Sequence, residues 1–265
     1  MQHLGQHFLK NKKILEKIVD ALNIKSGDVI VEIGPGHGEL TEQLVISNKE
    51  LVTRIIAVEK DKKLAQLLKE KFENNNKVEI VSGDILKLLP SLVTDYLLPI
   101  TDYKIVGNIP YYITGHLLRI LSELKHKPEI ITLLVQKEVA ERVVVHPPKM
   151  NLLAAATQSW SEPKIIAHVG KKNFSPPPQV DSAIVTLSPK PHTPNPRYFE
   201  FLRTLFKQPR KTIANNLMAN DKLQMTKSEL TKKLAAVRIN PNDRPQNLSL
   251  SEMQNLFRTL YNGRK

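Results

Sequence analysis

The sequence contains no cysteine among its 265 residues. A chain without thiols cannot build a disulfide framework, a thiolate zinc site or a cysteine nucleophile. This absence fits a protein of a reducing compartment.

Long apolar runs are also missing. Nowhere do eighteen apolar residues follow one another, and the first residues, MQHLGQHFLKNKK, contain no apolar core of a signal peptide. Neither export nor membrane spanning is indicated, so we expect a cytoplasmic protein.

With 41% hydrophobic residues, the chain can still bury the cores of one large and one small domain.

Acidic residues are scarce toward the end of the chain. Residues 191–265 hold 14 Lys and Arg against 5 Asp and Glu, whereas residues 1–190 hold 25 against 21. The tail therefore carries most of the net charge of +13. Such a concentration favours a polyanionic partner, because each neutralised phosphate releases counterions. A solvated basic surface without a partner is the alternative.

Four prolines within SPKPHTPNPRY (188–198) interrupt regular structure and predict a domain over residues 1–190 and a smaller one over residues 191–265. Before this division, apolar β-like runs alternate with helical patterns, which predicts an α/β fold with a mostly parallel sheet wrapped by helices. The last two runs, 163–169 and 182–187, are joined by a segment too short for a helical crossover. We therefore expect them to form an antiparallel hairpin at one edge.

The tail shows helical spacing and predicts a small all-helical, basic domain. A capping box of Ser249 and Glu252 is expected to begin its last helix. The expected helices cover residues 197–207, 210–219, 227–236 and 249–261.

The first candidate site is VEIGPGHGEL (31–40), where a β-like run leads through glycines into a helical pattern. Gly34 and Gly36 let the backbone turn tightly and approach a nucleotide-like ligand, although the GxGxG spacing differs from that of dinucleotide binders. A purely structural turn is the alternative.

Polar residues stand at the ends of the next three β-like runs: Glu59, Asp84 and Asn108. They are expected at one rim, because the carboxyl ends of parallel strands meet there. Glu59 could accept both ribose hydroxyls, or it could be an exposed acid paired with a neighbouring lysine. Asp84 could accept from an adenine amino group. Without a phosphate-binding lysine, the pattern indicates an adenosyl ligand that lacks phosphates, and S-adenosylmethionine fits.

With these features the chain resembles the Rossmann-like class I methyltransferases, which implies a seven-stranded sheet. NIPYY (108–112) is similar to their amino-methylating motif, and Ile109 resembles the branch that acts on ribosomal RNA adenine N6. Pro110 stops regular structure, so Asn108 and Tyr111 are expected to project from a loop. The resemblance implies that the Asn108 oxygen and the Ile109 carbonyl accept from N6 and that Tyr111 stacks on the base. A plain turn with a core tyrosine is the alternative.

A second aromatic wall is expected from Phe174 in NFSPPPQVDS (173–182), whose prolines stiffen the loop. By itself, this loop could be only a proline-rich turn into a strand. The resemblance favours a functional role, because these methyltransferases carry an F-x-P-x-P-x-V-[DN]-S motif here. Tyr112 is expected to serve packing rather than chemistry.

Nearly the whole chain resembles the bacterial small-subunit (16S) rRNA adenine N6,N6-dimethyltransferases, the KsgA family, on GQHFL (5–9), LVQKEVAERV (134–143), PRKTIANNL (209–217) and RPQNLS (244–249). His7 stands where some relatives have Asn, and a metal pair of His3 and His7 would lack further ligands. By position, the resemblance implies cofactor contacts from His7, Leu9, Gly34, Gly36, Glu59, Asp84, Ile85 and Asn108.

Basic residues of the tail are expected to hold RNA phosphates. The expected set is Arg203, Lys207, Arg210, Lys211 and Arg244. Two departures from the family stand out: Gly115-His116 occupies a place where relatives often have Ser/Thr-Pro, and Pro209-Arg210-Lys211 replaces a paired arginine.

The sequence thus predicts an S-adenosylmethionine-dependent enzyme that dimethylates N6 of two adjacent adenosines in the 3′-terminal hairpin of 16S rRNA. We expect a monomer that acts on the immature small ribosomal subunit, with neither metal nor membrane. Alternatives are a macrolide-resistance-type 23S rRNA methyltransferase and a non-catalytic ribosome-assembly or RNA-binding factor on the same fold. A nicotinamide oxidoreductase is disfavoured by the glycine spacing.

Overall fold

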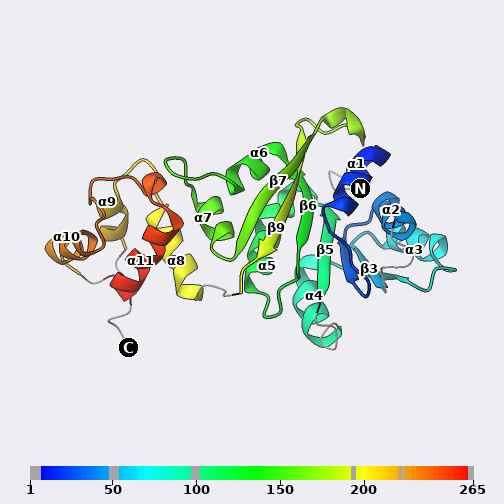
Figure 1. The fold of residues 1–265 in the computed structure, drawn as a ribbon, viewed down its shortest axis with the longest axis horizontal. Coiled ribbons are helices and arrows are strands. Elements are labelled where there is room, and N and C mark those ends of the chain that lie inside the picture. Colours follow the sequence, from blue (N-terminus) through cyan, green and yellow to red (C-terminus); the bar gives the residue numbers. More distant parts are fainter. Residues whose placement is uncertain are drawn as a thin grey trace. The chain divides into compact units, whose positions relative to one another are not determined.

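The computed structural model describes residues 7–47, 54–96, 102–191, 195–220, 223 and 225–261. The chain forms two compact units, Met1–Glu141 with Ser161–Lys190 and Arg142–Trp160 with Pro191–Lys265 (Figure 1). The break after residue 190 falls where the prolines predict it. Residues 142–160 were expected in the first domain and lie in the second unit instead. The reason is packing, because Ala154 and Ala155 are buried in the core of the second unit.

A seven-stranded sheet forms the centre of the first unit, in the order β4-β3-β2-β5-β6-β9-β7. The first five of these pair in parallel, and β9 pairs antiparallel with both β6 and β7. The expected edge hairpin is therefore confirmed. The strands are β2 (Val29–Ile33), β3 (Arg54–Glu59), β4 (Val78–Ser82), β5 (Tyr103–Asn108), β6 (Ile131–Gln136), β7 (Ser161–Val169) and β9 (Ser182–Pro189).

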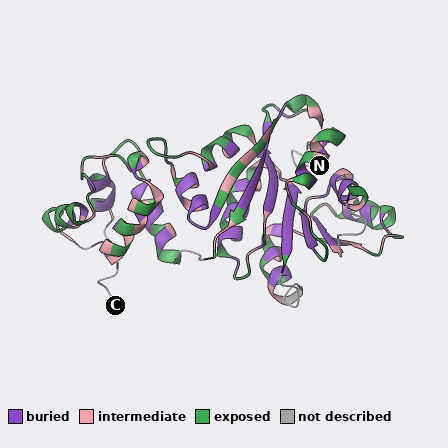
Figure 2. Ribbon diagram, in the orientation of Figure 1, coloured by how far each residue is buried: buried purple, intermediate pink, exposed green. Residues whose placement is uncertain are grey.

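Helices cover both faces of this sheet, which explains why every residue of β2 is buried (Figure 2). On one face, Leu15 and Ile18 of α1 and Leu44 of α2 pack against Ile30 and Val106 of the sheet. The helices preceding the edge hairpin are α1 (Lys12–Asp20), α2 (Glu39–Ser47), α3 (Lys62–Lys71), α4 (Ile85–Ser91), α5 (Thr114–Glu123), α6 (Lys137–Val143) and α7 (Leu152–Gln158). A π-helical stretch, Leu92–Tyr96, follows α4, and a 3₁₀ helix, η2 (Tyr111–Ile113), precedes α5.

A two-residue strand near the beginning of the chain was not foreseen. β1 (Phe8–Leu9) pairs antiparallel with β8 (Phe174–Ser175), and Lys10 N–H donates to the Asn173 carbonyl at 3.0 Å. This short ladder ties the amino-terminal segment to the proline-rich loop, over 160 residues later in the chain. It thereby carries His7 to the carboxyl rim of the sheet.

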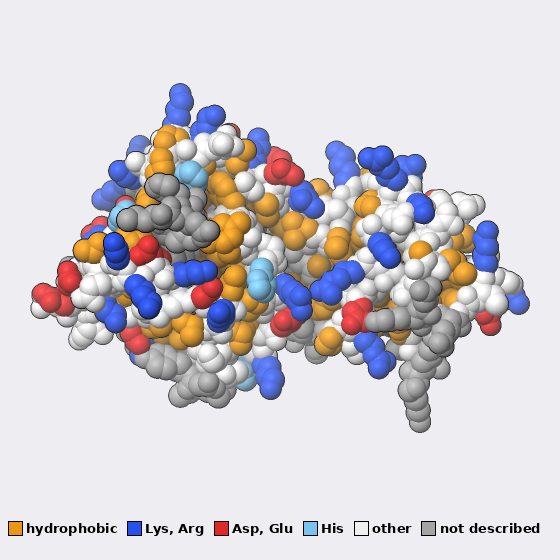
Figure 3. Space-filling model, turned by 180° about the vertical axis from the view of Figure 1, so that it is seen from behind, with side chains coloured by type: hydrophobic (Ala, Val, Ile, Leu, Met, Phe, Trp, Pro, Cys, Tyr) orange, Lys and Arg blue, Asp and Glu red, His pale blue; other side chains and the backbone are white. Residues whose placement is uncertain are grey.

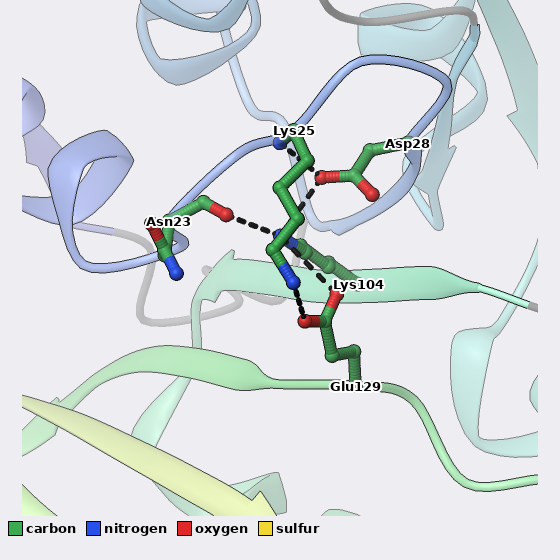
Figure 4. A network of polar contacts seen from close by, with 5 residues as sticks. All are labelled: Asn23, Lys25, Asp28, Lys104 and Glu129. Atoms are coloured by element: carbon green, nitrogen blue, oxygen red, sulfur yellow. Dashed lines mark hydrogen bonds and ion pairs between the residues drawn. The ribbon is translucent and has the colours of Figure 1, made fainter.

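An ion-pair network centred on the buried Lys104 lies at the amino-terminal ends of the strands, opposite the carboxyl rim (Figure 4). The Lys104 side chain is only 1% exposed, and its Nζ lies 2.8 Å from Asp28 Oδ2 and 3.4 Å from Glu129 Oε2. It also donates to the Asn23 carbonyl, while Lys25 pairs with Glu129. The segments that lead into β2, β5 and β6 are held together by these contacts.

The second unit is helical, as its sequence predicts. Its helices are α8 (Pro196–Leu205), α9 (Ile213–Met218), α10 (Lys227–Ala236) and α11 (Leu250–Tyr261). The expected capping box is confirmed, since Glu252 N–H donates to Ser249 Oγ at 3.3 Å and Ser249 N–H donates to Glu252 Oε2 at 2.7 Å. Within the described ranges, no helix is both long and apolar enough to cross a membrane.

Candidate active site

A cavity opens at the rim where β2, β3, β4 and β5 end. It unites residues that stand far apart in the sequence, as the convergence of parallel strand ends predicts. The predicted site residues that line it are His7, Gly34, Gly36, Glu59, Asp84, Ile85, Asn108, Ile109, Pro110 and Tyr111.

The glycine turn after β2 forms one wall of the cavity. Gly34 has φ +66° and Gly36 has φ +62°, a left-handed backbone that residues with a Cβ rarely adopt. A Cβ at Gly36 would stand 2.7 Å from the Phe8 ring, so glycine is required there for both reasons. The Phe8 ring in turn packs on His37 at a centroid distance of 4.2 Å.

Glu59 lies at the end of β3 and is only 2% exposed. Its Oε2 accepts from the Gly36 N–H at 3.1 Å and its Oε1 from the Asp61 N–H at 2.8 Å. Burial raises the pKa of the Glu59 carboxyl, and these backbone hydrogen bonds offset part of that effect. The alternative of an exposed acid paired with a lysine is wrong, because the carboxylate is buried and bound by backbone amides.

Asp84 caps the start of α4, where its Oδ1 accepts from the Leu86 N–H at 3.1 Å. Its Oδ2 lies 2.9 Å from Lys60 Nζ, and Lys60 also lines the cavity. Burial acts to raise the pKa of Asp84, but the hydrogen bonds from Lys60 and Leu86 together with the lysine charge hold it below its usual value. The sequence pattern did not predict a basic residue in the site. The structure places Lys60 there, paired with the Asp84 carboxylate.

Asn108, at the end of β5, is oriented by the amino-terminal segment. Its Nδ2 donates to the backbone carbonyl of His7 at 2.8 Å. A carbonyl can only accept, so this contact fixes which way round the amide stands and leaves Oδ1 as the free acceptor face. His7 itself is held by a 2.9 Å hydrogen bond between Nδ1 and the Pro176 carbonyl.

The two adjacent tyrosines differ in their surroundings. The Tyr111 hydroxyl lies 2.9 Å from Ser182 Oγ, and its ring centroid lies 6.1 Å from that of His7. Burial raises the pKa of Tyr111, so the phenol stays neutral. Tyr112 was expected to serve packing, and this is wrong: it lines the cavity and is 64% exposed.

Phe174 and Leu9 do not line this cavity. Phe174 is 5% exposed and Leu9 is 4% exposed, and both belong to the core cluster packed under α1 and α2. The strand pairing of β1 with β8 explains their burial, because it places the two residues opposite each other. The structure therefore does not bring the Phe174 ring to the site, and its role as a wall for the target base stays a prediction.

The predicted RNA-binding residues are all exposed and lie in the second unit, on whose visible face basic side chains outnumber acidic ones (Figure 3). The connection from α8 to α9, which carries Lys207, Arg210 and Lys211, is shaped by the buried Asn216. The Asn216 side chain accepts from the Gln208 N–H at 2.9 Å and donates to the Gln208 carbonyl at 3.0 Å. Ile213 N–H donates to the Asp243 carbonyl at 2.8 Å, so the segment before Arg244 lies beside this connection.

Sequence reasoning missed Phe8, Lys60 and Ser182 as parts of the site. Phe8 and Lys60 directly adjoin residues that were predicted, which was a usable signal. Ser182 was noted only as the end of a motif, and its bond to Tyr111 depends on the fold. His3 lies outside the described residues, and no cluster of three potential metal ligands occurs within them.

The chain matches the family described as "Ribosomal RNA adenine dimethylase" over residues 1–261. It belongs to this family. A relative named ribosomal RNA small subunit methyltransferase A, from Dehalococcoides mccartyi (strain CBDB1), is 37% identical over 258 residues, which cover 96% of this chain and 86% of the relative. The protein of the same name from Mycoplasma capricolum is 35% identical, with 98% and 97% covered.

Solved structures agree with this membership. A dimethyladenosine transferase from Plasmodium falciparum shares 27% identity, with a TM-score of 0.80 and with 94% of this chain and 96% of that chain covered. The 23S rRNA methyltransferase ErmE, at 23% identity, has a TM-score of 0.72 and shows the shared fold. The Rossmann-like fold class is confirmed. As a family member, the chain is an S-adenosylmethionine-dependent methyltransferase that acts on adenines of ribosomal RNA.

Proposed function

We propose that this dimethylase modifies N6 of two adjacent adenosines in the 3′-terminal hairpin of 16S rRNA, and that it acts as a monomer on an immature small ribosomal subunit. Relatives that span nearly the same length are named for the small subunit, which supports this choice of substrate. The likeness to ErmE supports the fold alone.

The orientation of Asn108 carries the proposal. The His7 carbonyl engages Nδ2 and leaves Oδ1 to accept, in a cavity already lined by two carboxylates. An adenine amino group needs acceptors for its N–H bonds, because its lone pair is delocalised into the ring until the nitrogen is held in a pyramidal geometry. Asn108 Oδ1 and the Ile109 carbonyl are the acceptors that we assign to it.

The cavity fits S-adenosylmethionine by the chemistry of its lining. Glu59 offers a buried carboxylate for ribose hydroxyls, and Asp84 and Ile85 lie at the adjoining strand end for adenine. Among the described lining residues, Lys60 is the only Lys or Arg, and it is paired with Asp84. The glycine turn, with Gly34 and Gly36, gives the methionine part a close approach to backbone. When bound, the cofactor supplies a methyl group on a sulfonium centre.

Methyl transfer to adenine N6 needs no strong base at this site. Asn108 Oδ1 and the Ile109 carbonyl hold the two N6 hydrogens, so that the nitrogen lone pair is available for methyl transfer. A nitrogen that has gained a methyl becomes acidic and releases its proton to water. Tyr111, anchored to Ser182, is placed to stack on the base, and its neutral ring face favours a nearby positive charge.

Tritium transfer from labelled S-adenosylmethionine into unmethylated small-subunit particles tests this function, with large-subunit particles as a parallel substrate and nucleoside analysis of the product. We expect dimethyladenosine in the small subunit alone. Label in the large subunit, or in neither, would contradict the proposed substrate.

The same assay tests the role of Asn108. We expect Asn108→Ala to lower kcat by about 100-fold or more, the usual effect of removing one preorganised polar group from a transition state. Calorimetric titration with S-adenosylmethionine should show that the variant still binds cofactor. Asn74→Ala, an exposed amide outside the cavity, is the matched control. Full activity of Asn108→Ala would remove this side chain from the mechanism.

A further inference from the structure

Tyr112 is an aromatic residue that the described chain leaves without a packing role. It is 64% exposed, although it borders the same cavity as Tyr111. An exposed ring beside a cavity offers a flat apolar face to a ligand that is larger than the cavity itself. The question is what covers that face during the reaction.

A continuous exposed stripe runs from Tyr112 along helix α5. Tyr112, Gly115, His116 and Arg119 are all exposed, and the buried residues Leu117 and Leu118 point elsewhere. Gly115 and His116 lie four and three residues before Arg119 in α5, so these three share one face of the helix, and Tyr112 lies in the 3₁₀ turn η2 that directly precedes it. It begins at the cavity mouth and leads away from it.

Gly115 leaves room on this stripe that the protein itself does not use. A Cβ built at Gly115 meets no atom within 4 Å, and no left-handed φ is found there. Alanine would also favour the helix by up to about 1 kcal/mol. Neither packing nor backbone conformation therefore calls for glycine at this position, and the open space is available to a partner.

The donors on the stripe can reach phosphate. His116 provides a ring N–H, and Arg119 provides a guanidinium whose partner, Glu123, lies 2.9 Å away on the same exposed surface. Exposed pairs of this kind are worth less than about 1 kcal/mol, so a phosphate can compete for the arginine. A stacking face followed by open space at Gly115 and then by phosphate donors matches a single nucleic acid strand.

We propose that this stripe, residues Tyr112, Gly115, His116 and Arg119, binds the single-stranded RNA next to the target adenosine. A flanking base stacks on Tyr112, the backbone passes over Gly115, and His116 and Arg119 hold the following phosphates. The proposal deepens the proposed function, because it names the contact that positions the substrate strand at the cavity mouth. Its continuity with the cavity favours RNA over a second protein chain as the occupant.

Fluorescence anisotropy with a labelled single-stranded oligoribonucleotide of ten adenosines tests the stripe without catalysis. We expect Tyr112→Ala to weaken binding about tenfold, since one stacked base contributes about 1–3 kcal/mol. Tyr112→Phe keeps the ring and should bind within about twofold of the parent. Leu67→Ala, which removes a similarly exposed apolar side chain on α3, is the matched control.

Gly115→Ala separates binding from folding. We expect it to raise Tm slightly, because of the helical propensity, and yet to raise KM for unmethylated small-subunit particles several-fold. Unchanged binding by Tyr112→Ala, or unchanged KM in Gly115→Ala, would overturn the proposal. If the parent protein methylates no small-subunit particle but oligoribonucleotide binding still depends on Tyr112, the proposed substrate fails and the stripe stands.

Discussion

Neighbouring residues of one motif have different surroundings in this protein. Tyr111 is half-buried and bonded to Ser182, whereas Tyr112 faces solvent. Ile109 between Asn108 and Pro110 is 1% exposed and belongs to the core, although it also borders the cavity. Within five residues, the motif therefore combines a polar acceptor (Asn108), a buried core residue (Ile109) and two tyrosine rings in different surroundings.

Glu32, just before the glycine turn, is a buried acid with an incomplete set of hydrogen bonds. It is 1% exposed, its Oε2 accepts from Thr41 Oγ1 at 2.7 Å, and its Oε1 has no partner in the described part of the chain. Burial raises the pKa of Glu32 to about 8, with the Thr41 hydrogen bond opposing the shift and the charge of Glu59 adding to it. The folded protein therefore holds a proton that the unfolded chain releases above its ordinary pKa of 4.5.

Glu32→Gln should reduce the dependence of stability on pH. Between the two pKa values the folded state binds more protons, so the free energy of unfolding of the parent falls as pH rises toward 8. We expect the variant to match the parent near pH 5 and to exceed it at pH 8 by a few kcal/mol, at about 1.4 kcal/mol per pKa unit. Urea unfolding at both pH values measures this, with Glu70→Gln as an exposed control. Parallel pH profiles for parent and variant would contradict it.

At the scale of elements, the two ends of the strands in the sheet have separate roles. The carboxyl rim carries the cavity, and the short β1–β8 ladder delivers His7 to it. The amino-terminal ends of the strands carry the Lys104 network, which holds together the segments at the starts of β2, β5 and β6. Stability and chemistry are thus placed at opposite ends of the same strands.

Lys104→Met should destabilise the fold without changing the chemistry of the folded enzyme. The substitution leaves the buried Asp28 carboxylate without its cation, and breaking a buried pair in this way costs about 3–5 kcal/mol. Denaturant unfolding measures the loss, and kcat per folded molecule should stay within about twofold. Lys137→Met, which breaks an exposed pair with Glu141 at 3.8 Å, should cost less than about 1 kcal/mol. Equal losses in the two variants would show that burial of the pair is unimportant.

At the scale of the whole molecule, charge and catalysis are divided between the two units. The first unit holds the cavity, and the second holds the exposed basic residues whose loop is shaped by Asn216. Phosphate contacts position an RNA without reading its sequence. We therefore expect the second unit to supply part of the affinity through phosphate contacts and the first to choose the adenosine.

Lys211→Gln should weaken RNA binding uniformly and make it less dependent on salt. Removing one phosphate contact is expected to reduce the slope of log K against log salt by about 1. Binding of unmethylated rRNA at several salt concentrations gives this slope. Lys232→Gln, an exposed lysine on α10 of the same unit, removes an equal charge outside the proposed contact and should leave the slope unchanged. Equal effects would mean that only net charge matters.

Much of the site follows from local patterns. Gly34, Glu59, Asp84 and Asn108 end successive parallel strands, and the geometry of such a sheet brings these ends together whatever the remaining contacts are. The edge hairpin and the helices of the tail follow from short connections and helical spacing in the same way. The residues at each strand end can be recognised from their near neighbours in the chain, and the general geometry of a parallel sheet then predicts that they meet.

Other features depend on segments that are distant in the chain. Asn108 is oriented by a carbonyl 101 residues away, and Phe174 is buried because β8 pairs with β1. The assignment of residues 142–160 to the second unit, the exposure of Tyr112 and the burial of Glu32 likewise rest on long-range packing. Residue type and spacing specify which groups stand at the rim, whereas their hydrogen-bond partners and burial arise only when the folded chain brings remote segments into contact.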